Sequence, residues 1–434
     1  MTAMISTQDA QYALDLVRSI CEEVGPGFPG SSQERERAFR FRRELEAHLG
    51  AENVAVEEFT VAPWAWLGSF PVGALLTLFA ALLNMFIGYF PSRFPEFIYW
   101  IAGTISLASS ILAVVLLIYE YIRYIEVIDP FFKKTQSLNI IGSLRRPGTK
   151  QVKRLLILSG HHDSAWENTW IGLFGYGLYV VIPAIFFGYI AMTVASLIQL
   201  AGQVTVNAGI IRFGTLGWPV LVFLIAPCII FAFFFNRGKK NGGTVPGAAD
   251  NLSACAIVAA ACRFLVRNPE YIPEDTEIRF ISFGCEEAGL RGSRRYVERH
   301  LDELKQLDAR LLNYETVASP EIGIMTTDVD GMKLSPEMVK STAAAAERAG
   351  VPYAVKPSPT GAGGSDAGSF SQAGIKAVSL LPMQVPQQLV AFYHQKRDTP
   401  GVLTIDPLVN VLKLTIEWIR CSEDSWGQPR IFRE

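Results

Sequence analysis

The sequence predicts an α/β domain, with a sheet covered by helices on both faces, into which four membrane-spanning helices are inserted as two hairpins. Predicted strands and helices alternate through the polar part of the chain, as in folds of this class. Four long apolar segments interrupt that part. Half of the 434 residues are apolar and 18% are charged, against a usual level of about 25% charged.

Short apolar runs bounded by turn residues predict the strands, and a 3.6-residue apolar period predicts the helices. The predicted strands include residues 54–62, 137–144, 154–160, 277–284 and 376–381. Helices are predicted over residues 254–266 and near the end of the chain, in LVNVLKLTIEWI. The charged residues from Glu34 to Glu46 are expected on a solvated helix face.

Four apolar segments reach the length of about 20 residues that a helix needs to cross a bilayer. They run from about Leu67 to Phe90, Phe97 to Glu120, Ile171 to Gly202 and Trp218 to Asn236. The third is long enough to be tilted, or broken at Pro183. The alternative is a set of core helices in a large soluble protein, but such helices carry a polar face and these segments do not.

The stretch Pro91 to Glu96 joins the first two segments, and a longer loop around Gln203 to Gly217 joins the last two. The four segments thus form two hairpins, so all the remaining polar sequence lies on one side of the membrane. Six basic residues flank the segments on that side, and the hairpin loops hold only Arg93 and Arg212. The positive-inside rule then predicts a cytoplasmic polar part. The basic flanking residues are Arg123, Lys133, Lys134, Arg237, Lys239 and Lys240.

Charge and cysteine usage exclude two classes of protein. The formal net charge is −2, without a basic excess, which argues against a nucleic-acid partner. The six cysteines are scattered and form no CxxC pair, which argues against a disulfide framework and mildly favours a reducing compartment. No signal peptide is visible at the N-terminus, which reads as a short amphipathic helix.

Polar clusters stand where predicted strands end, which is where sites gather in α/β folds. His161 and Asp163 follow one strand, and Glu286 with Glu287 follows another. A metal-bound histidine usually donates its other ring N–H to a carboxylate, and a metal can hold one of two adjacent carboxylates. Each cluster is weak alone, because His162 could be the ligand instead and the glutamate pair could be a solvated turn.

Three further residues have an ordinary explanation when each is considered alone. Asp250 precedes a predicted helix, where aspartate is a preferred cap. Glu315 in NYETV could be a surface residue, and His394 lies among aromatic residues in AFYHQKRDTP, as a structural histidine would. The order of the clusters along the chain favours a functional role for these residues.

GHHDS, PGAADN, CEEAGLRGS, NYETV, GGSDAGSF and YHQKRDT follow one another in an order that resembles the dinuclear zinc exopeptidases of metallopeptidase family 28. PGFPGSSQERERAFRF and SLNIIGSLRRPG are similar to earlier family segments. The resemblance covers nearly all the polar sequence and none of the apolar segments. It implies a zinc-exopeptidase-like mixed sheet flanked by helices, and an exopeptidase that acts on peptides.

The resemblance also implies a role for each matching residue. Asp250 would bridge two zinc ions, His161 and Glu315 would complete one site, and Glu287 and His394 the other. Glu286 would be the general base, Asp163 would orient His161, and Asp366 would have a supporting role. Glu315 stands where the family often has aspartate, so its longer side chain could change metal spacing. Similar ligands also accept cobalt or manganese.

The apolar segments are then insertions in a discontinuous peptidase domain. That domain comprises residues 1–64, 123–170 and 237–434, with hairpins at 65–122 and 171–236. The second hairpin separates His161 from Asp250, so the active site is expected near the membrane surface. We expect this placement to restrict entry to short peptides or to peptides held at the bilayer.

The competing interpretations are a single-zinc enzyme like glutaminyl cyclase, a receptor-like protein without metals, and a transporter. The complete ligand set argues against the first two. The lack of charges within the apolar segments argues against the third. Aminopeptidase activity is the preferred prediction, with carboxypeptidase or dipeptidase activity left open. The preferred residue, the physiological substrate and the oligomeric state do not follow from the sequence.

Overall fold

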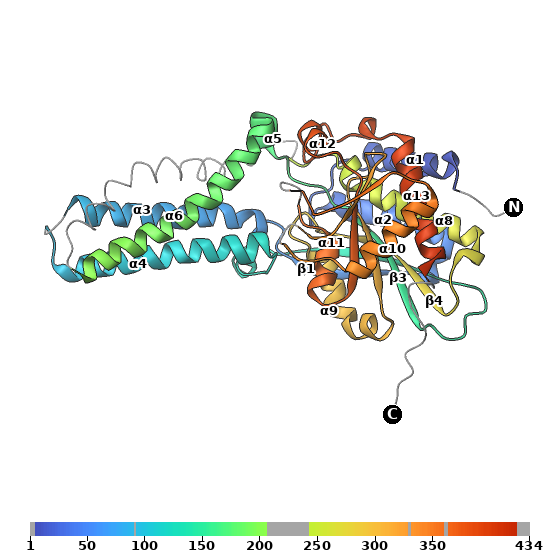
Figure 1. The fold of residues 1–434 in the computed structure, drawn as a ribbon, viewed down its shortest axis with the longest axis horizontal. Coiled ribbons are helices and arrows are strands. Elements are labelled where there is room, and N and C mark those ends of the chain that lie inside the picture. The colour runs from blue at the N-terminus through green and yellow to red at the C-terminus, as the bar shows by residue number, and fades with distance from the viewer. Residues whose placement is uncertain (1–4, 91–92, 206–242, 329–330, 360–362, 423–434) are drawn as a thin grey trace, which may run out of the picture. The chain divides into compact units, whose positions relative to one another are not determined.

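The computed structural model of the chain describes residues 5–90, 93–205, 243–328, 331–359 and 363–422 (Figure 1). These residues form two compact units. Unit 1 comprises residues 1–63, 134–167 and 244–434, and unit 2 comprises residues 64–133 and 168–243, apart from the residues that are not described.

Unit 1 is built on one mixed sheet with the strand order β1-β2-β4-β3-β5-β8-β6-β7. The central strands β4, β3, β5 and β8 run parallel. The pairs β1–β2, β2–β4 and β8–β6 are antiparallel, and β6 and β7 are parallel to each other. The strands are β1 Val54–Val61, β2 Thr135–Arg145, β3 Arg154–His161, β4 Thr276–Phe283, β5 Arg310–Tyr314, β6 Ile322–Met325, β7 Tyr353–Lys356 and β8 Lys376–Leu381.

Helices cover both faces of this sheet (Figure 1). On one face α2, α8, α10 and α13 contact the strands, with α1 packed on α8 and α13, and on the other face lie α9 and α11. All eight residues of β4 are buried, as expected for a strand between two helical layers. The helices of unit 1 are α1 Thr7–Glu23, α2 Ser32–Leu49, α8 Ser253–Arg267, α9 Arg291–Gln306, α10 Pro336–Ala349, α11 Asp366–Gln372, α12 Gln387–Ala391 and α13 Ile405–Arg420.

Small residues let α8 approach the end of β3 closely. A Cβ added to Gly160 would lie 2.5 Å from Ala254 Cβ and 3.1 Å from its backbone carbon. A side chain at residue 160 would therefore push the helix away from the strand. This contact brings the turn before α8 next to His161, the last residue of β3.

The structure confirms the predicted strands and helices of the polar part, and the mixed sheet with flanking helices. The expected solvated face from Glu34 to Glu46 is wrong in part, because Glu34 and Arg37 are fully buried. Both side chains form hydrogen bonds to loops around the sheet. The periodic pattern of charges along a helix cannot predict such buried contacts. The five cysteines in the described part of the chain are free, as expected.

Unit 2 consists of apolar helices that pack on one another through small and polar side chains. Its helices are α3 Ala65–Tyr89, α4 Glu96–Val115 with a continuation to Ile122, α5 Thr169–Phe174 and α6 Leu178–Val204. Asn84 of α3 donates a side-chain hydrogen bond to Ser196 Oγ of α6 at 2.8 Å. Ser106 of α4 donates to the carbonyl of Ala80 at 3.0 Å. Such interhelical hydrogen bonds are typical of helices that associate in lipid.

Four helical segments are long and apolar enough to cross a membrane, by length and composition alone: Ala65–Tyr89, Glu96–Ile122, Gly175–Val204 and Ala248–Arg267. The first three correspond to predicted spans. The last contains α8, whose most apolar stretch is 89% buried within the protein, so the core of unit 1 accounts for its composition.

The fourth predicted span, Trp218–Asn236, lies outside the described residues, so the two-hairpin arrangement stays a prediction. Within the third span the helix is interrupted at Gly175–Gly177, where Gly175 has a positive φ, and α6 continues through Pro183.

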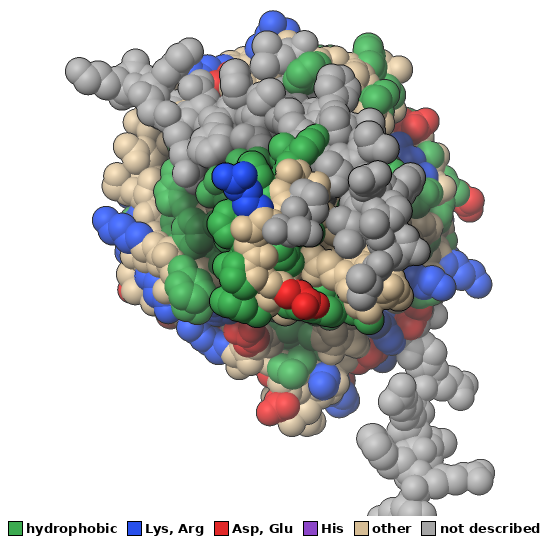
Figure 2. Space-filling model, turned by 90° about the vertical axis from the view of Figure 1, so that its left-hand side faces the viewer, with side chains coloured by type: hydrophobic (Ala, Val, Ile, Leu, Met, Phe, Trp, Pro, Cys, Tyr) green, Lys and Arg blue, Asp and Glu red, His purple; other side chains and the backbone are tan. Residues whose placement is uncertain are grey.

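Large exposed hydrophobic side chains are frequent on the helices of unit 2, and Figure 2 draws one face of the molecule with its hydrophobic side chains in green. The expected restriction of substrate entry also stays a prediction.

Candidate metal centre

The carboxyl ends of three neighbouring parallel strands carry the predicted site residues. His161 ends β3, Glu286 and Glu287 follow β4 after two residues, and Glu315 directly follows β5. Because β4, β3 and β5 lie side by side, their ends bring these side chains to one edge of the sheet.

Two residues from loops complete the cluster. Asp250 lies in the turn Ala248–Leu252 before α8, and His394 follows α12 in a left-handed conformation with φ 51°. Asp250 makes no capping bond to α8, so the helix-cap interpretation is not supported.

The side chains converge at short distances. His161 Nε2 lies 3.5 Å from Asp250 Oδ1, 3.6 Å from Glu286 Oε2 and 3.7 Å from Glu315 Oε2. His394 Nε2 lies 3.0 Å from Asp250 Oδ2 and 3.3 Å from Glu287 Oε1. Asp250 thus faces both histidines, one with each oxygen.

Three overlapping sets of these residues could hold a metal ion, each with ligand atoms within 4.8 Å of one another. Asp250 belongs to two of the sets, once with His161 and Glu315 and once with Glu287 and His394. The third set combines His161 with Glu286 and Glu287.

The donors fit a divalent cation such as zinc. Imidazole nitrogens and carboxylate oxygens are zinc ligands, and buried carboxylates need a partner of opposite charge. Asp250 Oδ2 and Glu287 Oε1 are both buried, and the same histidine nitrogen, His394 Nε2, lies 3.0 and 3.3 Å from them. These three atoms could hold one metal ion.

Asp163 is fully buried and contacts two parts of the cluster. Its Oδ1 lies 3.3 Å from His161 Nδ1, which leaves Nε2 of that ring facing the carboxylates. Its two oxygens also accept the backbone N–H groups of Glu286 at 3.2 Å and Glu287 at 2.9 Å. Asp163 therefore holds the glutamate pair as well as the histidine ring.

His162 points away from the cluster, as the alternation of side chains along a strand requires. Its Nδ1 lies 2.8 Å from Ser282 Oγ, and burial lowers the pKa of the ring to about 4. Asp366 begins α11 and is fully buried, outside the three candidate metal sets.

Burial and neighbouring charges separate the protonation behaviour of the carboxyl groups. Burial raises the pKa of Glu286 well above its usual value. The neighbouring His161 acts to lower this pKa, and the carboxylates of Glu287 and Glu315 act to raise it. Burial also acts to raise the pKa of Asp250, but its contacts with His161 and His394 outweigh burial and hold that pKa below its usual range. The raised pKa of Glu286 favours a group that accepts a proton, and the lowered pKa of Asp250 favours a ligand that stays ionised.

Sequence reasoning missed the residues that hold the ligands in place. Asp398 is fully buried and accepts the backbone N–H groups of Ala249 at 2.7 Å and Asp250 at 3.0 Å. Asn251 and Asn313 each donate an amide N–H to Glu315, at 2.7 and 2.8 Å. Asp398 and Asn251 lie within the segments YHQKRDT and PGAADN. Their nearness in sequence to His394 and Asp250 was the only feature of the sequence that could have indicated this supporting role.

Two buried residues of α2 bond to the loops around the cluster. Glu34 accepts the backbone N–H of Cys285 at 2.9 Å, next to Glu286. Arg37 donates to the carbonyl oxygens of His162 at 3.3 Å and Pro246 at 2.6 Å. One turn of α2 therefore connects all three segments that carry His161, Asp250 and Glu286.

Comparisons with known proteins agree with this geometry. Residues 236–419 match the model of peptidase family M28. Aminopeptidase YwaD of Bacillus subtilis is 32% identical over 160 residues, which are 36% of this chain and 33% of the relative. The probable lipoprotein aminopeptidase LpqL of Mycobacterium tuberculosis is 41% identical over 86 residues, 20% of this chain and 16% of that protein. The chain thus spans a third or less of these curated relatives.

Solved structures share the fold over almost the whole chain. A zinc aminopeptidase from Bacillus subtilis superposes with a TM-score of 0.52 at 16% identity, covering 95% of this chain and 94% of the other. An aminopeptidase from Aneurinibacillus sp. strain AM-1 gives 0.53 at 16% identity, covering 96% and 94%. A glutaminyl cyclase from an Acidobacteriales bacterium gives 0.54 at 12% identity, covering 97% and 95%. The chain is thus similar to peptidase family M28 over residues 236–419 and shares the fold of these solved structures.

Proposed function

We propose that the protein is a membrane-anchored metallo-aminopeptidase that removes N-terminal residues from peptides with two zinc ions. One observation carries this proposal: Asp250 lies between two half-sites, one with His161 and Glu315 and one with Glu287 and His394. The names of the related zinc aminopeptidases support zinc and peptide substrates.

In this proposal His161, Asp250 and Glu315 would hold one ion, and Asp250, Glu287 and His394 would hold the other. When bound, zinc supplies Lewis-acid chemistry that polarises a peptide carbonyl and activates a water molecule. The chain's own residues do the remaining work. The carboxylate of Asp163, 3.3 Å from His161 Nδ1, favours the tautomer with the proton on Nδ1, so that Nε2 keeps a free lone pair.

Glu286 is the proposed general base. It receives a proton from the attacking water and delivers it to the leaving amine, and its raised pKa favours uptake of that proton. Its position beside His161, with its backbone held by Asp163, keeps the carboxylate at the cluster throughout the reaction.

Glutaminyl cyclase activity is the second candidate, because glutaminyl cyclases are among the proteins of similar fold. A single-zinc cyclase would not need both half-sites, so the paired half-sites favour the peptidase. Mass spectrometry of a peptide with N-terminal glutamine separates the two. Hydrolysis releases the first residue, whereas cyclisation keeps it and releases ammonia.

Replacing each of the two adjacent glutamates in turn should separate the effect on catalysis from the effect on metal binding. We expect Glu286→Gln to keep its zinc and to lose about 10²–10⁴-fold in kcat, the usual contribution of a general base. Glu287→Gln should lose zinc, because it removes a ligand charge. Peptide hydrolysis and zinc content are measured on both variants. A Glu286→Gln enzyme within tenfold of wild type would contradict the assigned base.

Replacing Asp398 tests whether the backbone before α8 must be held for metal binding. In Asp398→Asn an amide N–H₂ would face one of the backbone N–H groups that the carboxylate now accepts. We expect zinc affinity to fall about 10–100-fold, as for other residues that support metal ligands. Competition with a chromophoric chelator measures this affinity. The control is Asp406→Asn on the exposed first turn of α13, and equal affinities in the two variants would contradict the role.

Membrane insertion and a cytoplasmic catalytic unit belong to the same proposal. They are supported by the three apolar helices of unit 2 and by the basic residues that flank the predicted spans. Arg93 follows α3 at an exposed position, and Lys150 is exposed in the loop between β2 and β3.

Cysteine labelling in intact cells tests this orientation. We expect a membrane-impermeant thiol reagent to label Arg93→Cys and to leave Lys150→Cys unlabelled until the membrane is permeabilised. The wild-type chain, with its native cysteines, gives the background. Labelling of Lys150→Cys alone would reverse the orientation, and labelling of both without permeabilisation would contradict membrane spanning between these positions.

A further inference from the structure

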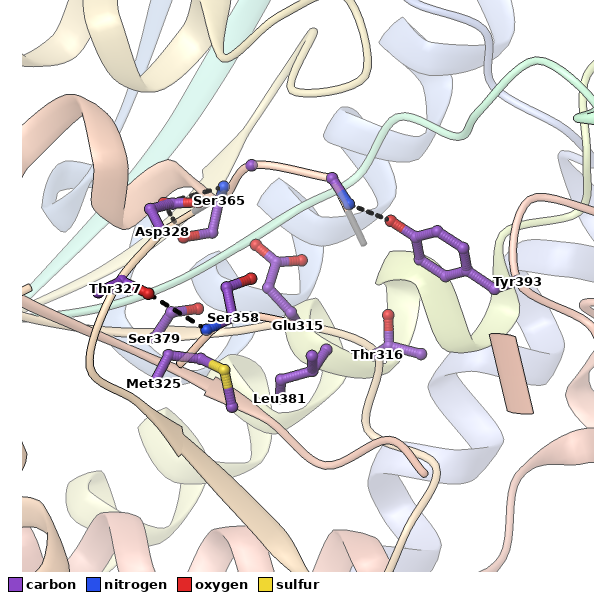
Figure 3. Close-up of a pocket in the computed structure, with 12 residues that line it drawn as sticks. Glu315, Thr316, Met325, Thr327, Asp328, Ser358, Ser365, Ser379, Leu381 and Tyr393 are labelled. Atoms are coloured by element: carbon purple, nitrogen blue, oxygen red, sulfur yellow. Dashed lines mark hydrogen bonds between the residues drawn. The ribbon is translucent and has the colours of Figure 1, made fainter. Parts of the chain in front are cut away.

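A wide pocket of unit 1 lies at the N-terminus of α2, and none of its lining residues belongs to the three candidate metal sets. Its volume is about 430 Å³, within the range of about 300–1,000 Å³ typical of small-molecule sites. The pocket beside Glu315 has a volume of about 30 Å³, which is room for water alone (Figure 3). We call the wide pocket the α2 pocket; its lining residues are Gly30, Ser31, Ser32, Arg35, Thr60, Lys134, Thr135 and Gln136.

Every side chain that lines the α2 pocket can donate a hydrogen bond, and none of the described lining residues is acidic. Arg35 and Lys134 are cations, four residues carry hydroxyl groups and Gln136 carries an amide. Lys134 is exposed and makes no ion pair in the described part of the chain, while Arg35 pairs with Glu58 at 2.7 Å. A pocket of this composition attracts an anion.

Two hydroxyl groups of the pocket act as acceptors within the protein, which leaves their own O–H groups to donate. Ser31 Oγ accepts the backbone N–H of Glu34 at 3.1 Å, and Thr60 Oγ1 accepts a side-chain N–H of Gln136 at 2.9 Å. Among the residues that the structure describes, neither hydroxyl donates to another group. Both O–H groups can therefore bond to the oxygens of a bound anion.

The first turn of α2, an 18-residue helix, adds backbone donors to the pocket. The first N–H groups of a helix have no acceptor within it, and the cap Ser31 satisfies that of Glu34. The N–H groups of Ser32 and Gln33 make no hydrogen bond in the described ranges of the chain. With the positive end of the helix dipole, these groups favour a phosphate in particular.

Two carboxyl groups contact residues of the pocket without lining it. Glu58 pairs with Arg35, and half of its own side chain is exposed to solvent. Glu34 is fully buried and accepts the backbone N–H of Gly30 at 2.6 Å. Burial raises the pKa of Glu34 to about 8, which favours its neutral form. Neither carboxyl group therefore takes the place of an anion in the pocket.

The chain connects the α2 pocket to the apolar helices of unit 2 at two points. Thr60 precedes Ala65, the first residue of α3, by five residues, and five residues span at most about 18 Å. Lys134 directly follows Lys133, the last residue of unit 2 before the chain enters β2. The covalent chain thus keeps the pocket close to the start of α3, and the ends of a membrane span lie at the lipid headgroups.

We propose that the α2 pocket binds the phosphate group of an anionic phospholipid. The inference rests on the proposed membrane insertion and adds a lipid partner to it. Lys134 and Arg35 pair with the phosphate. Ser31, Thr60 and the first N–H groups of α2 donate to its oxygens. A headgroup that also carries a cation, such as phosphocholine, binds more weakly, because that cation meets the two positive side chains.

The first test compares dioctanoyl phosphatidylglycerol with dioctanoyl phosphatidylcholine, which differ in headgroup charge. Native mass spectrometry of the detergent-purified full-length protein counts the bound lipid molecules. We expect phosphatidylglycerol to bind about tenfold more tightly or better, since two cations face the headgroup. Equal binding of the two lipids overturns the proposal. Inorganic phosphate is the second probe, and its displacing phosphatidylglycerol at an equal concentration would overturn the assignment to a lipid.

Flotation of the protein with phosphatidylcholine vesicles separates this inference from the proposed membrane insertion. A protein that does not float with the vesicles contradicts membrane insertion itself. A protein that floats, but does not distinguish the two lipids, contradicts the pocket alone.

The second test assigns the lipid preference to the pocket by comparing two adjacent lysines. Lys134 lines the pocket, and Lys133 is equally exposed but does not line it. We expect the affinity for phosphatidylglycerol to fall about fivefold in Lys134→Gln and to stay close to wild type in Lys133→Gln. Equal losses in the two variants would indicate attraction to surface charge in general and overturn the pocket assignment.

The third test fills the pocket with a negative charge while keeping α2 stable. Ser32→Glu places a carboxylate in the first turn of α2, where a negative charge favours the helix. We expect a thermal midpoint at or above that of wild type, together with a loss of at least about tenfold in affinity for phosphatidylglycerol. A folded Ser32→Glu protein that binds this lipid as tightly as wild type overturns the proposal.

Discussion

The burial of several carboxylates around two histidines is the constraint on which the rest of this structure depends. Asp250, Glu286, Glu287 and Glu315 are nearly inaccessible to solvent and approach His161 or His394 within 3.0–3.7 Å. The ligand atoms of each candidate set lie within 4.8 Å of one another, and carboxylates this close in a protein interior repel strongly, which two imidazoles cannot balance. A cation bound among the carboxylates would offset their repulsion. The need for this cation also accounts for the position of Asp250, which faces both histidines.

The surrounding structure holds these charges in place through backbone hydrogen bonds. Asp163 holds the loop of the glutamate pair, Asp398 holds the turn of Asp250, and Arg37 bonds to carbonyl groups in two segments. Gly160 completes the arrangement, since only a residue without a side chain lets α8 pack so closely on β3. The ligands therefore come from distant parts of the chain, yet their positions are fixed by few buried residues.

The sequence predicted the strands and helices of unit 1 well, because these depend on local information, whereas the ligand roles stay a prediction. Apolar periodicity marked β3, β4 and α8, and the order of short motifs marked the residues that the structure brings together. Buried supporting residues escaped because their role depends on partners far away in sequence: Glu34 meets Cys285, and Asp398 meets Asp250. A helical charge pattern cannot separate the buried Glu34 and Arg37 from their solvated neighbours.

The measurement that tests the central claim most directly is the zinc content per chain of the purified full-length protein, beside a His394→Ala variant. The account predicts two zinc ions per wild-type chain and a clear loss of zinc in the variant, because His394 and Glu287 share one half-site with Asp250. One ion per wild-type chain would instead favour a centre like that of a cyclase. A wild-type protein that binds no zinc, even when zinc is supplied, would contradict the account.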